Sequence, residues 1–247
     1  MHRRMGWLLT TIIAIVALIM VLVLYRNNGQ PTRVRTMAEE AMNHNKLPFA
    51  KKGQDSYEEY QPTKKDLANK NYVERGQLKK IGQYQLTETG LEQKWVDNKK
   101  VDSTITNGNM IYHIKNINII QNTARTQNSL LSAKRSLNDR KLGAKFITLV
   151  INYDVTNNNL VTAITPGITA IKYSDDKTMS ILSGIYNDGR LNTSGIVPYE
   201  TTSTTTTVLV PKHVGKHLSS LDIQFATVKD SANNEIVKPS SVRTITF

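Results

Sequence analysis

One stretch of this sequence constrains the chain more than any other: residues 6–25 form an unbroken run without a charged side chain. As a helix, a run of this length rises about 30 Å, which is the thickness of the hydrocarbon core of a bilayer. Trp7 and Tyr25 stand at its ends, where amphipathic rings favour the headgroup level. We therefore predict a single transmembrane helix over residues 6–25, preceded by a cytoplasmic N-terminus over residues 1–5.

A cleavable signal peptide is the alternative, but its apolar core is shorter, about 7–15 residues, and ends in a small-x-small site. Here the run ends in Leu24-Tyr25-Arg26, which is no such site. Arginines flank both ends of the run, so their count does not choose an orientation. The downstream sequence is rich in Asn, Thr and Ser, as exported bacterial β-sandwiches often are. We predict a single-pass protein of the cell membrane whose C-terminal domain is extracytoplasmic.

Composition narrows the chemistry. The chain has no cysteine, which excludes disulfides, thiolate metal sites, a cysteine nucleophile and a lipid-modified cysteine. An exported chain without disulfides suits a Gram-positive bacterium. Of the net charge of +12, Arg3 and Arg4 supply two, and the rest is divided equally between residues 26–100 and 101–247, whereas a nucleic-acid site gathers its Lys and Arg on one face. A diffuse basic surface instead suits an anionic membrane or cell wall, and we expect no nucleic-acid partner.

Residues 26–103 are predicted to be a polar, partly helical stalk. Pro31, Pro48 and Pro62 interrupt polar sequence with few apolar periods, and short helical turns are expected near residues 36–42 and 63–72. Residues 90–103, which include Trp95, leave two interpretations open: a leading strand of the next domain, or the end of the stalk.

From residue 104 to residue 247 short β-branched segments alternate with turn residues, a pattern typical of sandwiches and barrels. In residues 146–155 the side chains of Ile147, Leu149, Ile151 and Tyr153 share one face of a strand at a period of two. Other strands are predicted at residues 110–121, 164–173, 178–185, 201–210, 221–228 and 241–247. The predicted fold is mainly β: an immunoglobulin-like β-sandwich of about seven strands.

Residues 109–247 resemble a telokin-like, immunoglobulin-related family of bacterial exported domains of unknown function, often found on lipoproteins, which shares its fold with a mycobacterial immunoprotective extracellular antigen. Two stretches carry the resemblance: residues 145–157, a long apolar strand closed by Asn157, and residues 208–212, a late strand ending in Pro211-Lys212. The chain departs from the family in lacking the lipid-modified cysteine and in having Pro198-Tyr199 in place of a Pro-Gly turn. The resemblance implies a fold and an extracytoplasmic location, with no common activity.

The densest basic stretch lies between the first two long predicted strands and comprises Lys134, Arg135, Arg140, Lys141 and Lys145. It is our candidate polyanion-binding site, since each cation near an anionic surface contributes about 1 kcal/mol at moderate salt. The alternative is an ordinary solvated loop.

We predict no catalytic, cofactor or metal site. His213 and His217 have the spacing of a metal pair on a helix, but they flank Gly215 with no Glu between them. Asp175-Asp176 and Asp188 lack the spacing of a calcium loop and are interpreted as turn residues. No nucleophile elbow, phosphate loop or dinucleotide fingerprint is present in the sequence.

The functional prediction is therefore a membrane-anchored, non-enzymatic extracytoplasmic binding or adhesion module whose partner is a protein or an envelope polymer. The alternative is a structural subunit of an envelope assembly such as a secretion or conjugation apparatus. An unrecognised hydrolase is the third hypothesis, and it would depend on His213 or Asp188. The sequence does not fix the oligomeric state.

Overall fold

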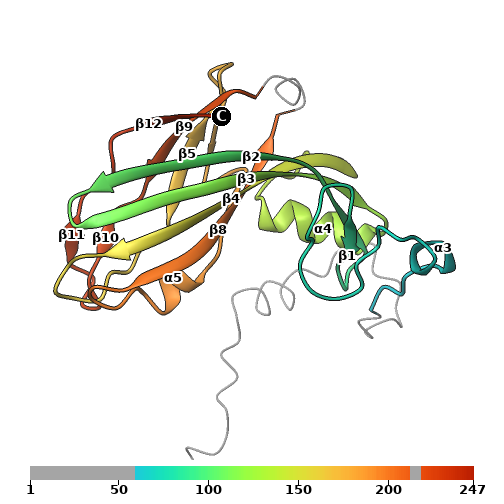
Figure 1. The fold of residues 1–247 in the computed structure, drawn as a ribbon, viewed down its shortest axis with the longest axis horizontal. Coiled ribbons are helices and arrows are strands. Elements are labelled where there is room, and N and C mark those ends of the chain that lie inside the picture. Colours follow the sequence, from blue (N-terminus) through green and yellow to red (C-terminus); the bar gives the residue numbers. More distant parts are fainter. Residues whose placement is uncertain (1–58, 212–217) are drawn as a thin grey trace, which may run out of the picture. The chain divides into compact units, whose positions relative to one another are not determined.

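Two antiparallel sheets build the folded part of the chain (Figure 1). The computed structural model describes residues 59–211 and 218–247, which belong to one unit, Glu58–Phe247. The predicted helix over residues 6–25 and the first part of the predicted stalk lie outside the described residues. Among the residues that are described, no helix is both long and apolar enough to cross a membrane.

The first sheet has six strands in the order β1-β2-β3-β4-β8-β7, and the second has four in the order β12-β9-β5-β6. The strands of the first sheet are β1 (Tyr84–Leu86), β2 (Leu91–Asn107), β3 (Met110–Ala124), β4 (Lys145–Asn157), β8 (Thr201–Val210) and β7 (Ile185–Asn187). Those of the second are β12 (Arg243–Thr246), β9 (Ser220–Phe225), β5 (Ile168–Lys172) and β6 (Thr178–Ser180). A separate pair is formed by β10 (Val228–Lys229) and β11 (Glu235–Val237), and the helices are α3 (Lys64–Leu67), α4 (Gln127–Ser136) and α5 (Arg190–Thr193).

The alternation in β4 has the predicted effect. Leu149, Ile151, Tyr153 and Val155 are buried in the core shared by the two sheets, because side chains two apart in a strand point to the same face. The mainly β prediction is therefore confirmed.

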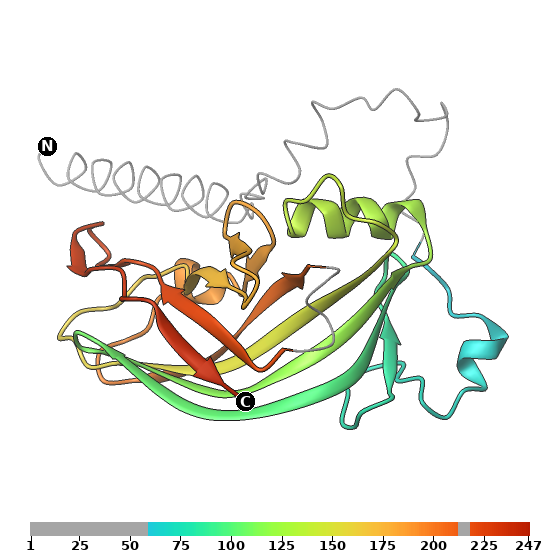
Figure 2. The same ribbon diagram turned by 90° about the horizontal axis from the view of Figure 1, so that it is seen from above.

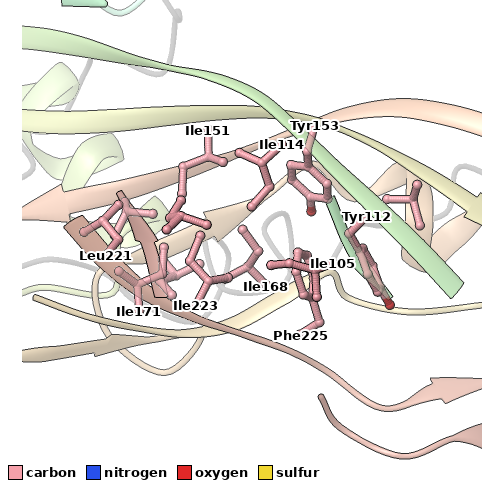
Figure 3. Packing of buried hydrophobic residues seen from close by; sticks show 14 of the residues in the cluster. Ile105, Tyr112, Ile114, Ile151, Tyr153, Ile168, Ile171, Leu221, Ile223 and Phe225 are labelled. Atoms are coloured by element: carbon pink, nitrogen blue, oxygen red, sulfur yellow. The ribbon is translucent and has the colours of Figure 1, made fainter. Parts of the chain in front are cut away.

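Aromatic rings fill the centre of this core, as Figure 3 shows. Tyr112 of β3 stacks on Phe225 of β9, with ring centroids 3.7 Å apart and planes 16° from parallel. Tyr153 meets the same Phe225 ring edge-on at 5.8 Å, and its buried hydroxyl bonds to that of Thr206 at 3.2 Å. Burial raises the pKa of Tyr153 to about 12, so the hydroxyl stays protonated.

The prediction of about seven strands was too low, since the described residues contain strands β1 to β12. One predicted strand, residues 178–185, is divided into β6 and β7, which lie in different sheets. Gly184 stands at the break with φ +87°, and a β-carbon there would lie 2.4 Å from the sulfur of Met179. The chain turns at this glycine because other residues rarely adopt that backbone conformation.

The predicted stalk over residues 26–103 also ends earlier than expected. The last residues of that segment, from Leu91 onward, belong to β2, which pairs with β3 from Leu91↔Ala124 to Asn107↔Met110, so the leading-strand interpretation of residues 90–103 is the correct one. Register shifts interrupt β2 near Trp95 and between Lys100 and Ser103. Bulges increase the local twist, and Figure 2 shows how strongly the β2–β3 hairpin bends.

A partly buried ionic network links residues 59–90 to this sheet. Arg125, just after β3, binds the Asp66 carboxylate through two hydrogen bonds of 2.7 and 2.9 Å and also reaches Glu92 of β2 at 2.5 Å. Asp66, only 4 % exposed, accepts further hydrogen bonds from Thr63 and Tyr84. The Arg125 guanidinium, followed by these hydroxyls, holds the pKa of Asp66 well below its usual range.

Helix α4 packs on the other face of the first sheet. Its Ala133 and the following Leu137 form a small second core with Leu142 and Leu209. The helix begins at a capping box in which the hydroxyl of Thr126 accepts from the backbone of Ser129. This helix replaces the loop expected between residues 121 and 146.

Candidate anion-binding pocket

A pocket of about 780 Å³ opens where β4 begins. It lies between the α4–β4 connection, the first residues of β4, strand β6 and the last residues of β8. The lining residues are Gln121, Asp139, Lys141, Leu142, Gly143, Lys145, Phe146, Ile147, Lys177, Thr178, Met179, Ser183, Leu209, Val210 and Pro211. We call it the lysine pocket.

Three lysines line this pocket, Lys141, Lys145 and Lys177, and all three residues are exposed. Asp139 is the one acidic residue among the described residues that line it, and the carboxylate accepts a hydrogen bond of 2.8 Å from the backbone nitrogen of Lys141. The pocket therefore carries a net positive charge.

The floor of the lysine pocket is apolar. Leu142, Met179 and Leu209 are buried there at 6–8 % exposure, and Phe146 and Ile147 are half-buried. Ligand sites in proteins commonly combine an apolar lining with a few charged groups that fix orientation. This arrangement suits an anion that carries an apolar portion.

Two of the five basic residues predicted as a polyanion-binding site line the lysine pocket, and three do not. Lys141 and Lys145 line the pocket. Lys134 and Arg135 lie in the last turn of α4, and neither they nor the exposed Arg140 line it.

Lys177 was not among the site residues predicted from the sequence. It lies in the turn between β5 and β6, where its backbone nitrogen bonds to Asp175 at 3.2 Å and its carbonyl accepts from Tyr173 at 2.9 Å. The turn itself was visible as Asp175-Asp176-Lys177. Its position beside Lys141 and Lys145 depends on the packing of the second sheet against the first.

The remaining candidate residues are engaged elsewhere or not described. His213 and His217 lie outside the described residues. Asp188 pairs with Arg190 at 2.6 Å, and this guanidinium lowers the pKa of the carboxyl. Asp176 pairs with Lys172 at 2.7 Å. Within residues 59–211 and 218–247, no three His, Asp or Glu side chains are grouped as metal ligands.

Comparison with known proteins does not assign this chain to a family. No family model and no curated protein matches it. A functionally unknown protein from Listeria monocytogenes EGD-e has a similar solved structure, at 13 % identity and a TM-score of 0.39, over 61 % of this chain and 88 % of that one. An uncharacterized beta-sandwich protein from Clostridium difficile 630 matches at 15 % identity and a TM-score of 0.31, over 60 % of this chain and 99 % of that one.

Proposed function

We propose that this chain is a membrane-anchored, non-enzymatic binding module, displayed outside the cytoplasm, that holds a phosphate-bearing envelope polymer or lipid in the lysine pocket. The anchor in this proposal is the uncharged run over residues 6–25. The observation that supports the binding function is that Lys141, Lys145 and Lys177 line one pocket together with an apolar floor. The finer fold assignment, a telokin-like and immunoglobulin-related sandwich, belongs to the same proposal.

The residues of the pocket are suited to binding a phosphate-bearing molecule without reacting with it. A lysine ammonium is a compact charge on a flexible stem, so three of them adapt to phosphates spaced along a polymer. The apolar floor gives a glycerol or acyl segment a surface on which to exclude water. Because the cations are exposed, dissolved salt screens them over a Debye length of about 8 Å at physiological ionic strength, and we expect binding that weakens as salt is added.

The direct test is a titration of the full chain, in an uncharged detergent, with fluorescently labelled poly(glycerol phosphate). The variant K141Q/K145Q/K177Q removes three charges from the pocket. The matched control K70Q/K79Q/K80Q removes three charges from exposed lysines outside it. At about 1 kcal/mol for each cation, the pocket variant should bind on the order of 100-fold more weakly.

The control variant should bind within a few-fold of the wild type. An equal loss of affinity in both variants would mean that binding depends only on net charge. It would contradict the lysine pocket as the binding site. If the wild type did not bind the polymer at low salt, the proposed polymer ligand would be wrong.

Display is tested by protease treatment of intact cells. Release of fragments from the folded unit, with residues 1–25 retained in the membrane, is the expected result. Protection of the unit until the membrane is broken would contradict the proposed orientation.

A structural subunit of an envelope assembly is the second candidate, and an exposed apolar cluster favours it. Leu160, Val197 and Tyr199 are 80 %, 52 % and 66 % exposed. They lie on two loops joined through the Asn157 side chain, whose amide donates to the carbonyl oxygens of Val161 and Ile196 at 2.9 and 2.8 Å.

A subunit of this kind should purify in detergent with stoichiometric partners. Those partners should be lost from a variant that carries both L160S and Y199S. Purification of the wild type alone favours the binding module.

A further inference from the structure

A second hollow, of about 300 Å³, lies between α4 and the outer face of the first sheet. Residues of the β1–β2 segment, β3, α4, β4, β7 and β8 line it, so most of its walls belong to regular elements. We call it the uncharged groove, because the described residues that line it include no Lys, Arg, His, Asp or Glu, although 21 % of the chain's residues are charged. A charged ligand would therefore find no ion-pair partner among these residues.

Neutral hydrogen-bonding groups replace charges in this groove. Ser132 and Ser136 present hydroxyls from α4, Thr207 presents one from β8, and Gln93 and Asn122 contribute amides. The apolar part of the lining comes from β2, α4 and β4, and includes Leu91, Phe146 and Val150. These hydroxyls, amides and apolar side chains would complement a ligand that carries both hydrogen-bonding groups and small apolar surfaces.

The most specific feature of the uncharged groove is a pair of buried polar side chains that bond to each other. Asn122 is 1 % exposed and Thr148 is 3 % exposed. The amide nitrogen of Asn122 donates to the hydroxyl of Thr148 at 2.9 Å and to the carbonyl oxygen of Ile120 at 3.2 Å. Within the described residues the Asn122 carbonyl oxygen and the Thr148 hydroxyl proton make no further hydrogen bond, although the buried side-chain atoms that lack every partner are those of Tyr112 and Thr204.

One acceptor position on Asn122 and one donor position on Thr148 therefore stay available on two side chains that bond to each other and line the same groove. A sugar hydroxyl, or the acetamido group of an amino sugar, donates one hydrogen bond and accepts another. Such a group would satisfy both residues together.

Tyr186 supplies the surface that a sugar ring would cover. It lies on the edge strand β7, directly opposite Thr207 of β8, and is 53 % exposed. A tyrosine ring offers an apolar face and a polar hydroxyl, which suit the C–H face and the equatorial hydroxyls of a pyranose.

We infer that the uncharged groove is a binding site for a neutral saccharide, with Asn122 and Thr148 contacting one of its hydroxyl or acetamido groups and Tyr186 covering the ring. This site is distinct from the lysine pocket in charge and in most of its residues, although Phe146 lines both. The inference does not depend on the proposed polyanion binding.

The test uses the full chain in a polyoxyethylene detergent, since detergents with sugar headgroups would compete. Chitotetraose and cellotetraose are titrated at millimolar concentrations, and binding is followed by calorimetry and by saturation-transfer NMR of the saccharide. The wild type should bind at least one of them. Tyr186→Ala should weaken that binding about 10-fold, the loss expected for one ring contact and the apolar area it covers.

Tyr199→Ala is the matched control, because Tyr199 is similarly exposed at 66 % and does not line the groove. It should leave saccharide affinity unchanged, as should K141Q/K145Q/K177Q. Asn122→Leu should abolish binding in protein whose melting temperature shows that it is folded. Failure of the wild type to bind either saccharide, or binding that Tyr186→Ala leaves unchanged, overturns the inference.

Discussion

Arg125 binds Asp66 through two parallel hydrogen bonds, of 2.7 and 2.9 Å, although 59 positions separate the two residues in the sequence. The pair joins residues 59–90 to the end of β3. Both groups are largely removed from water, since their side chains are 23 % and 5 % exposed. Such a pair is expensive to break from one side, because the remaining charge stays buried without its partner.

Arg125→Ala should therefore destabilise the folded unit by about 3–5 kcal/mol. Urea unfolding of the full chain, followed by tryptophan fluorescence, measures this change. Arg135→Ala is the control, because Arg135 is exposed on α4 and makes no ion pair among the described residues. Equal stabilities of the two variants would show that the network does not hold residues 59–90 in place.

The same pair predicts an acid-sensitive stability. The folded-state pKa of Asp66 lies below the ordinary value of 3.8, so its contribution is present above that pH and is lost as the pH falls below it. The free energy of unfolding should decrease between about pH 5 and pH 2, and Asp66→Asn should make this decrease shallower. An identical pH dependence in wild type and variant would contradict the assignment.

The sequence predicted those strands that bury one face only. In β4 the buried residues alternate, so Leu149, Ile151 and Tyr153 identify the strand without any tertiary information. Strand β2 offers no such signal, because most of its residues are neither fully buried nor fully exposed. Its Asp97, Lys99 and Lys100 resemble those of a spacer.

Helix α4 and the lysine pocket were hidden for different reasons. The capping box of α4 uses Ser129 at the position where Glu or Gln is usual, so the start signal was weak. The pocket combines Lys141 and Lys145 with Lys177 of another sheet, a proximity that no local pattern encodes. The uncharged groove is defined by the absence of charge across six segments, which is visible only after folding.

A buried hydroxyl in the core leads to a further prediction. The hydroxyl of Tyr112 is buried and has no hydrogen-bond partner among the described residues, and burial raises the pKa of Tyr112 above its usual range. Since an unsatisfied buried polar group costs about 1–3 kcal/mol, Tyr112→Phe should raise stability by about 1 kcal/mol while keeping the stack on Phe225.

Tyr153→Phe is the matched substitution with the opposite expected sign. The Tyr153 hydroxyl bonds to that of Thr206 at 3.2 Å, and Thr206 in turn bonds to Asn187 at 2.6 Å. Removing this hydroxyl should lower stability by about 1 kcal/mol. Chemical denaturation of the two variants compares them directly, and destabilisation by Tyr112→Phe would show that its hydroxyl is satisfied in solution.

The boundary of the folded unit is tested with three fragments. Residues 59–247 contain the network and all the described strands, and should unfold cooperatively. Residues 88–247 lack Asp66 and β1 but retain β2, and should fold with lower stability.

Residues 104–247, the domain predicted from sequence, lack most of β2 and leave β3 as a long open edge, which favours aggregation. Ile105 would stay, but the backbone groups of β3 that pair with Leu91 to Lys100 would lose their partners. Size-exclusion chromatography and circular dichroism distinguish these states, and a soluble, cooperatively folded 104–247 fragment would show that β2 is dispensable.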